Sequence, residues 1–155
     1  MYALEVVRRP VVDDHARVLE AVVEWWPAGR GTEIATLLPR LFFQHFTSTS
    51  WIAEDGDGVL RAFLIGFRSA DDPSVAYIHF VGVHPDLRRR GVGRALYTRF
   101  FDDMAALGVT RVDAITGPPN TVSQAWHRAM GFTVSDAVPD YDGPGEDRVA
   151  MSRAL

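Results

Sequence analysis

An apolar strand, an arginine- and glycine-rich turn and a helix follow one another between Val75 and Leu107, and this succession constrains the fold more than any other part of the chain. The run from Val75 to Val83 is typical of a buried strand. Glycines in the turn carry no β-carbon, so backbone N–H groups can approach an anion where the helix dipole is positive. The sequence therefore predicts a pyrophosphate-binding turn made by Arg88, Arg89, Arg90, Gly91, Val92, Gly93 and Arg94.

Two other phosphate-binding motifs do not fit this turn. A Walker A loop needs a lysine, and all 16 residues of the Lys and Arg class are arginine. A Rossmann fingerprint needs Gly or Ala where Leu96 stands, although Asp113 lies about 20 residues on, as its ribose-binding acid would. Only one strand–turn–helix unit of this kind occurs, so a dinucleotide is disfavoured. An arginine-rich, solvated helix start is the alternative without a ligand.

The motif Arg88-x-x-Gly91-x-Gly93, preceded by Val83-His84-Pro85, resembles the signature of the GNAT family of N-acetyltransferases. The resemblance implies acetyl-CoA as cosubstrate. It also implies that the strand at Val81, Gly82 and Val83 pairs with the pantetheine arm, with an N–H, that of Val83, turned toward the acyl oxygen. A strand glycine also marks a bulge or a close approach of the backbone, and the alternative for Gly82 is that it only relieves crowding.

The order of the predicted elements extends the resemblance over nearly the whole chain. Residue patterns predict strands at 2–7, 49–54, 59–69, 75–83, 111–116, 132–138 and 149–155. They predict helices from Asp13 or Asp14 to Trp26, from Thr32 to Phe42 with a kink or break at Pro39, from Gly91 to Leu107, and from Asn120 to Met130. The resemblance implies an α/β (α+β) fold with a mixed, splayed, mostly antiparallel sheet of about seven strands and about four helices, in a single domain 1–155.

The amino-acid composition limits which cellular compartment and which kinds of catalysis are expected. A chain of 155 residues that is 47% hydrophobic can bury a core. It has no apolar run of about 18 residues and no charged-then-apolar leader, so we expect a cytoplasmic protein that does not enter a membrane. Zero cysteines exclude Cys-ligated zinc and a cysteine nucleophile, so we expect no metal and a direct transfer in a ternary complex. A net charge of −4 disfavours nucleic acid as a partner.

The last predicted helix carries the first candidate catalytic residue, His127. At about 100° per residue, His127 shares a side with Asn120, away from an apolar stripe. GNAT members with the pattern Asn-x6-Tyr before Gly-Phe use the Asn on the pantetheine or phosphate region and the Tyr as the acid for the thiolate. This chain has Asn120-x6-His127 before Gly131-Phe132, so the resemblance implies cofactor binding by Asn120, but a histidine replaces the tyrosine. His127 is the candidate acid because an imidazole can donate a proton near neutral pH. The alternatives are an exposed surface histidine and a thiolate that leaves unassisted. The stripe is Val122, Ala125, Trp126 and Ala129.

A second candidate is His79, which shares a strand face with Tyr77, Val81 and Val83. GNAT members often place a glutamate base at the position of Tyr77, and no carboxylate occurs between Ser74 and Val83. His79 is therefore the candidate general base, directly or through water. A histidine satisfied within the strand packing is the alternative.

Five acids and Tyr141 precede the last predicted strand. They indicate attraction for a cationic amine, and one of them or Tyr141 can take part in proton transfer; a solvated acidic loop is the alternative. Aromatics near the N-terminus are candidates for the wall of an acceptor pocket or for the core. The acids are Asp136, Asp140, Asp142, Glu146 and Asp147, and the aromatic group is Trp25, Trp26, Phe42, Phe43, His45 and Phe46.

These observations favour an N-acetyltransferase acting on a primary amine of a small molecule. The alternatives are a CoA-binding regulatory module without turnover, acetylation of a protein N-terminus, and an interaction module that uses the arginine turn on nucleic acid. A homodimer is an expectation from the habit of the family.

Overall fold

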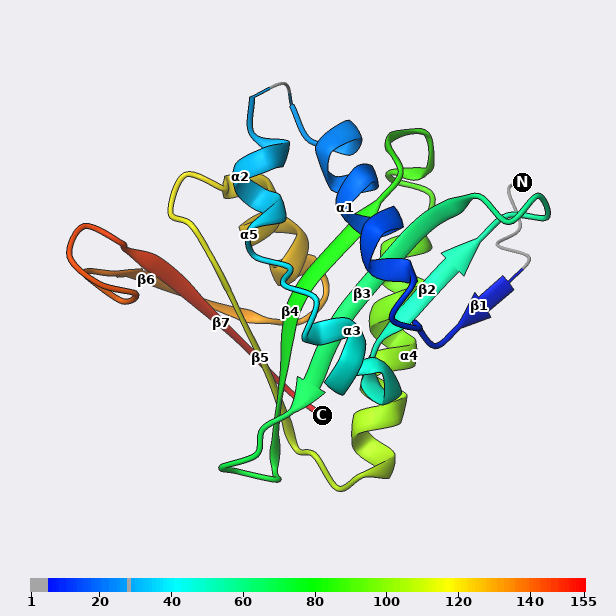
Figure 1. Cartoon of the computed structure of the whole chain (residues 1–155). Coiled ribbons are helices and arrows are strands. Elements are labelled where there is room, and N and C mark those ends of the chain that lie inside the picture. The colour runs from blue at the N-terminus through cyan, green and yellow to red at the C-terminus, as the bar shows by residue number, and fades with distance from the viewer. Residues whose placement is uncertain (1–5, 28) are drawn as a thin grey trace. The chain divides into compact units, whose positions relative to one another are not determined.

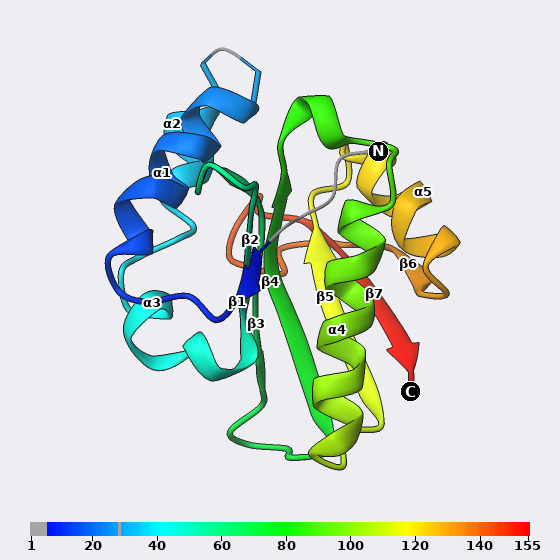
Figure 2. The same ribbon diagram turned by 90° about the vertical axis from the view of Figure 1, so that its right-hand side faces the viewer.

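The computed structural model describes residues 6–27 and 29–155 and is drawn in Figures 1 and 2. Its strands are β1 (Val6–Arg8), β2 (Trp51–Glu54), β3 (Leu60–Arg68), β4 (Val75–Val83), β5 (Arg111–Thr116), β6 (Thr133–Val138) and β7 (Arg148–Ala154). Its α-helices are α1 (Asp14–Trp25), α2 (Gly31–Ala35), α3 (Phe42–His45), α4 (Val92–Ala106) and α5 (Thr121–Ala129). Two short 3-10 helices, η1 (Thr47–Thr49) and η2 (Pro85–Leu87), complete the described elements.

The strands form one seven-stranded sheet in the order β1-β2-β3-β4-β5-β7-β6. The pairs β1–β2, β2–β3, β5–β7 and β6–β7 are antiparallel. The parallel pair β4–β5 joins Val75–Tyr77 to Arg111–Asp113, and α4 supplies the crossover that a parallel pair requires. The predicted fold class, a mixed and mostly antiparallel sheet, is confirmed.

The chain divides into two compact units. Unit 1 comprises the chain up to Phe67 together with Phe80–Phe100, and unit 2 comprises Arg68–His79 and Phe101–Leu155. In unit 1, α1 covers one face of β2 and β3 (Figure 1). Its apolar side, with Val18, Val22 and Trp25, is buried in one cluster with Ile52 and Phe63. This packing fixes the C-terminal end of α1.

Unit 2 is built on the antiparallel ladders of β5, β7 and β6. Val112, Met151 and Phe132 are buried there, whereas most of β6 is exposed. A register shift lies between Val134 and Ala137, and within it the Ser135 hydroxyl accepts the Ala150 N–H at 2.9 Å. The side chain thus takes over a bond that the bulged backbone does not make.

Several predicted boundaries differ from the structure. The helix predicted from Thr32 to Phe42 is two short helices, α2 and α3, because Pro39 cannot continue a helical ladder. Asp13 stands at the N-cap of α1 without a side-chain bond, whereas Asp14 accepts the Val11 N–H at 2.8 Å. Leu107 is exposed rather than part of the buried stripe of α4. Residues 2–5 of the predicted first strand lie outside the described residues.

Candidate active site

The turn predicted to bind pyrophosphate lies in unit 1, between β4 and α4. Arg89 and Gly91 adopt positive φ values of 60° and 81°. The first helical bond runs from the Ala95 N–H to the Gly91 carbonyl at 2.9 Å, so the amides of residues 91–94 come before the hydrogen-bonded ladder. A β-carbon on Gly91 would meet no atom within 4 Å, so the space beside this backbone is open. The turn can therefore present N–H donors and positive dipole to an anion.

The arginines of the turn have different surroundings. Arg88 donates from Nη2 to the Trp25 carbonyl at 3.0 Å and from Nε to the Val83 carbonyl at 3.4 Å. Its guanidinium thus ties the turn to the C-terminus of α1. Arg89 and Arg94 are exposed, and neither guanidinium has a hydrogen bond or ion pair with the described residues. Arg89 and Arg94 are therefore the better-placed candidates for binding phosphate, and Arg90, also exposed, stays a candidate.

Gly82 has a packing reason of its own. A β-carbon there would lie 2.4 Å from Cε1 and 2.7 Å from Cζ of Phe63, closer than carbon atoms can approach. The Phe63 ring in turn stacks near Trp25 and Phe80, at centroid distances of 6.1 and 5.7 Å. The structure therefore contains the steric crowding that was the alternative explanation for Gly82. Backbone contact of Val81, Gly82 and Val83 with pantetheine stays a prediction.

In unit 2, Asn120 is the N-cap of α5. Its Oδ1 accepts the Ser123 N–H at 3.2 Å, as predicted from its position before the helix. The amide nitrogen of this side chain is not used in that bond, so the predicted contact with the cosubstrate stays a prediction.

His127 lies away from the stripe of Val122, Ala125 and Ala129, as predicted, but the implied burial of that stripe was wrong, since His127 is on the buried side of α5. Its side chain is buried, whereas Val122 is 80% exposed and Ala125 and Ala129 are exposed. The imidazole meets the rings of Trp126 and Phe132 edge-on, at 5.2 and 5.0 Å. The exposed-surface alternative was therefore wrong as well. Helical spacing shows which apolar residues share a face of the helix, but it does not show that this face is the one buried by tertiary packing.

The surroundings of His127 favour its neutral form. Burial lowers the pKa of the imidazole, and the bond to the Ser123 carbonyl only partly offsets this. Nδ1 lies 2.7 Å from that carbonyl, which can only accept, so Nδ1 carries the proton. In this tautomer Nε2 is a proton acceptor, which suits an acid poorly. The acid role of His127 stays a prediction, and the structure adds no support to it.

His79 and Tyr77 lie on one face of β4, as predicted, with ring centroids 6.3 Å apart. Both are half-buried, whereas Ile78 between them is buried. Burial raises the pKa of Tyr77 to about 12, and interactions with Tyr141, Asp142 and Asp113 add to this effect. Tyr77 therefore stays protonated, which leaves His79 as the candidate base on this strand.

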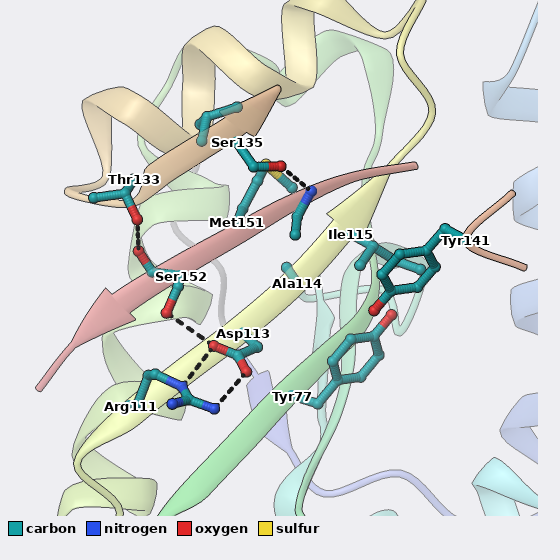
Figure 3. A pocket seen from close by; sticks show the side chains of 12 residues that line it. Tyr77, Arg111, Asp113, Ala114, Ile115, Thr133, Ser135, Tyr141, Met151 and Ser152 are labelled. Carbon is teal, nitrogen blue, oxygen red and sulfur yellow. Dashed lines mark hydrogen bonds and ion pairs between the residues drawn. The ribbon is translucent and has the colours of Figure 1, made fainter. Parts of the chain in front are cut away.

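Tyr141 and Tyr77 border a pocket of about 480 Å³ in unit 2. Figure 3 shows their hydroxyl groups pointing toward each other, Tyr77 from β4 and Tyr141 from the loop between β6 and β7. Sequence reasoning did not find this pocket, because its lining residues come from five separate segments. The other lining residues are Arg111, Asp113, Ala114, Ile115, Thr133, Val134, Ser135, Ala150, Met151 and Ser152.

The acids of the β6–β7 loop have structural partners. Asp140 accepts the Gly145 N–H at 2.7 Å, and Asp147 accepts the Asp140 N–H at 2.9 Å. Arg148 pairs with Asp142 at 2.9 Å and with Glu146 at 3.3 Å. Most of the predicted negative charge is therefore used to hold the loop, and a general attraction for cations is weaker than five free carboxylates would give.

No group of three or more His, Asp or Glu side chains in residues 6–27 and 29–155 is arranged to hold a metal ion. Within the same ranges, no helix has the length and apolar character needed to span a bilayer.

The model of the acetyltransferase (GNAT) family matches residues 16–132. The L-2,4-diaminobutyric acid acetyltransferase of Nocardia farcinica is 33% identical over 90 residues, which are 58% of this chain and 46% of that protein. The mycothiol acetyltransferase of Beutenbergia cavernae is 36% identical over 87 residues, which are 56% of this chain and 29% of that protein. The chain thus matches less than half the length of these relatives.

Among solved structures, the diaminobutyrate acetyltransferase of Paenibacillus lautus, in complex with L-2,4-diaminobutyric acid and coenzyme A, superimposes with a TM-score of 0.72. It is 24% identical, and the match covers 96% of this chain and 93% of that one. The Ard1 protein of Thermoplasma volcanium gives a TM-score of 0.74 at 18% identity, with 97% of each chain covered. These likenesses establish the fold.

Proposed function

We propose, since this chain belongs to the acetyltransferase (GNAT) family, that it transfers the acetyl group of acetyl-CoA to a primary amine of a small molecule. The observation that carries the proposal is the turn between β4 and α4. There, the helix-start amides and the glycine at position 91 are open, and the exposed guanidinium groups of Arg89 and Arg94 have no hydrogen bond or ion pair with the described residues.

The residues of the turn fit a pyrophosphate group. Arg89 and Arg94 would supply charge-assisted donors, and the amides of residues 91–94 would supply neutral ones. Arg88 would hold the turn in place through the Trp25 carbonyl, rather than contact phosphate. Acetyl-CoA supplies an activated thioester, and the protein's part is to hold it and the amine in line.

The proposed site transfers protons without the tyrosine acid of the family pattern. The attacking amine must be neutral, and His79 is the candidate group to take its proton. Because the chain has no cysteine, the acetyl group passes directly between the two bound substrates. A thiolate of CoA needs little help to leave, so a dedicated acid is not required for the proposal.

The names of similar proteins support a small-molecule amine as the acceptor. Proteins similar to part of this chain are named as acetyltransferases of L-2,4-diaminobutyric acid and of mycothiol, both small molecules. Acetylation of a protein N-terminus stays an alternative, because the ribosomal-protein-S18-alanine N-acetyltransferase of Escherichia coli has a similar fold.

Binding of acetyl-CoA tests the turn. We expect Arg89→Ala to weaken the affinity about tenfold, since it removes one charge-assisted bond to phosphate. Arg40→Ala is the matched control, because Arg40 is also an exposed arginine of unit 1. Gly91→Ala should weaken binding further, whereas Gly58→Ala strains a similar backbone, with φ of 75° and open space, away from the turn. Equal affinities in all four variants by calorimetry would refute the assignment.

Turnover separates an enzyme from a regulatory module. The natural chain should release CoA from acetyl-CoA in the presence of a primary amine and form the acetylated amine in equal amount. Tight binding of acetyl-CoA without product, over a panel of small amines and N-terminal peptides, would instead favour the regulatory alternative.

A further inference from the structure

Two residues of the segment between β4 and the turn contact the C-terminal end of α1. Arg88 donates from Nη2 to the Trp25 carbonyl at 3.0 Å, and the His84 ring meets the Trp25 ring edge-on at 5.5 Å. Figure 1 shows the loop after β4 beside this end of α1. The last turn of α1 has no basic residue of its own, so Arg88 supplies, from 63 residues away in sequence, the positive charge that favours helix C-terminal carbonyls.

The end of α1 and the start of α2 form one corner, which comprises residues 22–26 and 30–35. A β-carbon on Gly31, the first residue of α2, would lie 2.5 Å from the Cα of Val23. Only a glycine permits so close an approach of two helix backbones. Because the two helices touch through their backbones, a bond that holds the Trp25 carbonyl also restrains α2.

The shape of the turn depends on the residue that follows Arg88. Arg89 has a φ of 60°, in the left-handed region that residues with a β-carbon disfavour. The Arg88 side chain is held by two carbonyls, that of Val83 at 3.4 Å and that of Trp25 at 3.0 Å. These bonds fix the backbone that enters Arg89. An anion meets the helix-start amides only in the ordered turn, so anion binding and the bond to Trp25 favour the same conformation.

We propose that Arg88 is a positioning residue that couples cosubstrate binding at the turn to the α1–α2 corner. A bound cosubstrate strengthens the hold on the corner and, because coupling is reciprocal, an ordered corner raises the affinity of the turn. The proposal rests on the function proposed above, since it requires the turn to bind coenzyme A. Trp26, a candidate for the wall of the acceptor pocket, lies in the corner. The cosubstrate thereby orders part of the acceptor side before the amine binds.

Hydrogen exchange with and without saturating coenzyme A tests the coupling. The reporters in the corner are the amides of Trp26, Arg30 and Ile34, which are hydrogen-bonded at 3.2, 3.0 and 3.0 Å, and the reporter at the turn is the Ala95 amide. In the natural chain, coenzyme A should slow exchange at all four amides, by about fivefold in the corner. In Arg88→Ala at equal saturation, exchange should slow at Ala95 alone. Each chain is compared with its own free form, so a general loss of stability does not produce this pattern.

Two further variants make the comparison specific to Arg88. Arg88→Lys keeps a charged donor and should restore part of the slowing in the corner. Arg68→Ala is the matched control, because Arg68 is also exposed and donates to a carbonyl beyond the end of a helix, that of Leu107 after α4, at 3.3 Å. This variant should keep the full response of the corner to coenzyme A.

The sign of the response in the natural chain decides between coupling and its competitor, in which Arg88 leaves Trp25 to contact phosphate. Faster exchange in the corner on addition of coenzyme A would support the competitor and overturn the coupling. An unresponsive corner, or equal slowing in the natural chain and Arg88→Ala, would overturn it too. If coenzyme A does not bind, the coupling and the proposed function both fail. If the corner responds as expected but acetyl-CoA yields no acetylated amine, only the proposed function fails.

Discussion

At the scale of single residues, Gly82 shows how a glycine in a motif can be required by packing. The Phe63 ring occupies the place of the missing β-carbon. We expect Gly82→Ala to lower the free energy of unfolding by about 1–3 kcal/mol, because one of the two groups must move in a packed core. Chemical unfolding measures this loss.

Phe63→Leu provides the internal control for Gly82→Ala. The shorter side chain removes the clash, so Gly82→Ala should cost less in the Phe63→Leu background than in the natural chain, which is a positive coupling in a double-mutant cycle. Equal losses in both backgrounds would mean that the ring is not what excludes a side chain at this position.

A second prediction at the residue scale concerns how stability depends on pH through the buried His127. Burial lowers the pKa of its imidazole in the folded state, so the unfolded chain binds more protons between that pKa and about 6.5. The contribution of His127 to stability is therefore complete above about pH 6.5 and is lost as the pH falls through the folded-state pKa. We expect His127→Phe, measured by urea unfolding at pH 7 and pH 5, to show a smaller loss on acidification.

His45→Gln is the control for this effect, because His45 is exposed in unit 1. The same His127→Phe variant also tests the acid role suggested by the family pattern. A large fall in kcat with unchanged acetyl-CoA affinity would support that role, whereas kcat within about threefold of the natural chain, a difference below 1 kcal/mol, would leave the histidine a packing residue.

At the scale of elements, a charge network joins β1, α1 and β2 in unit 1. Asp14 is buried and accepts bonds from Arg8 Nη1 at 2.8 Å and Arg17 Nη1 at 3.1 Å, and Glu54 pairs with the same two arginines. Burial alone would raise the pKa of Asp14 and Glu54. The bonds and charges of the arginines outweigh it and hold both pKa values below their usual range. The network therefore stabilises the fold while both acids are ionised.

We expect Asp14→Asn to lower the free energy of unfolding at pH 7 by about 1–3 kcal/mol, less than for a fully buried pair because the arginines are partly exposed. The stabilisation by Asp14 and Glu54 should be lost as the pH falls below about 4, through their lowered folded-state pKa values. Asp13→Asn is the matched control, because the neighbouring acid is exposed and makes no capping bond. Equal stabilities of the two variants at pH 7 would contradict a role for the network.

At the scale of the whole molecule, the proposed reaction needs a base to take the proton of the ammonium group before the amine attacks. His79→Ala should abolish the acidic limb of the kcat/KM profile, since His79 is the candidate base on β4. Tyr77→Phe is the control on the same strand face. Because the pKa of Tyr77 is about 12, its hydroxyl is protonated throughout the working range and its loss should keep the limb. Profiles measured with a primary amine would refute the assignment if His79→Ala retained the limb and Tyr77→Phe lost it.

Much of the element order was predictable from local patterns. The bounds of β4 and β5 were predicted exactly as the structure has them, because apolar runs between Pro, Gly and Asp residues mark strands. Asn120 was predicted as a cap from its place before a helical run. The split of the second predicted helix at Pro39 was left open between a kink and a break, since the choice depends on what packs against both halves.

The sequence by itself determined the family, the fold class and the turn between β4 and α4. The spacing of glycines and arginines sets the conformation of the neighbouring backbone, and this local effect does not depend on how distant residues pack. Only the tertiary structure decided that His127 is buried, that Arg88 bonds to the end of α1, and that Arg148 pairs with two of the loop acids. It also brought Tyr77 and Tyr141 to one pocket. Contacts between residues far apart in sequence depend on how the strands pair and the loops close, and no local spacing encodes those distances.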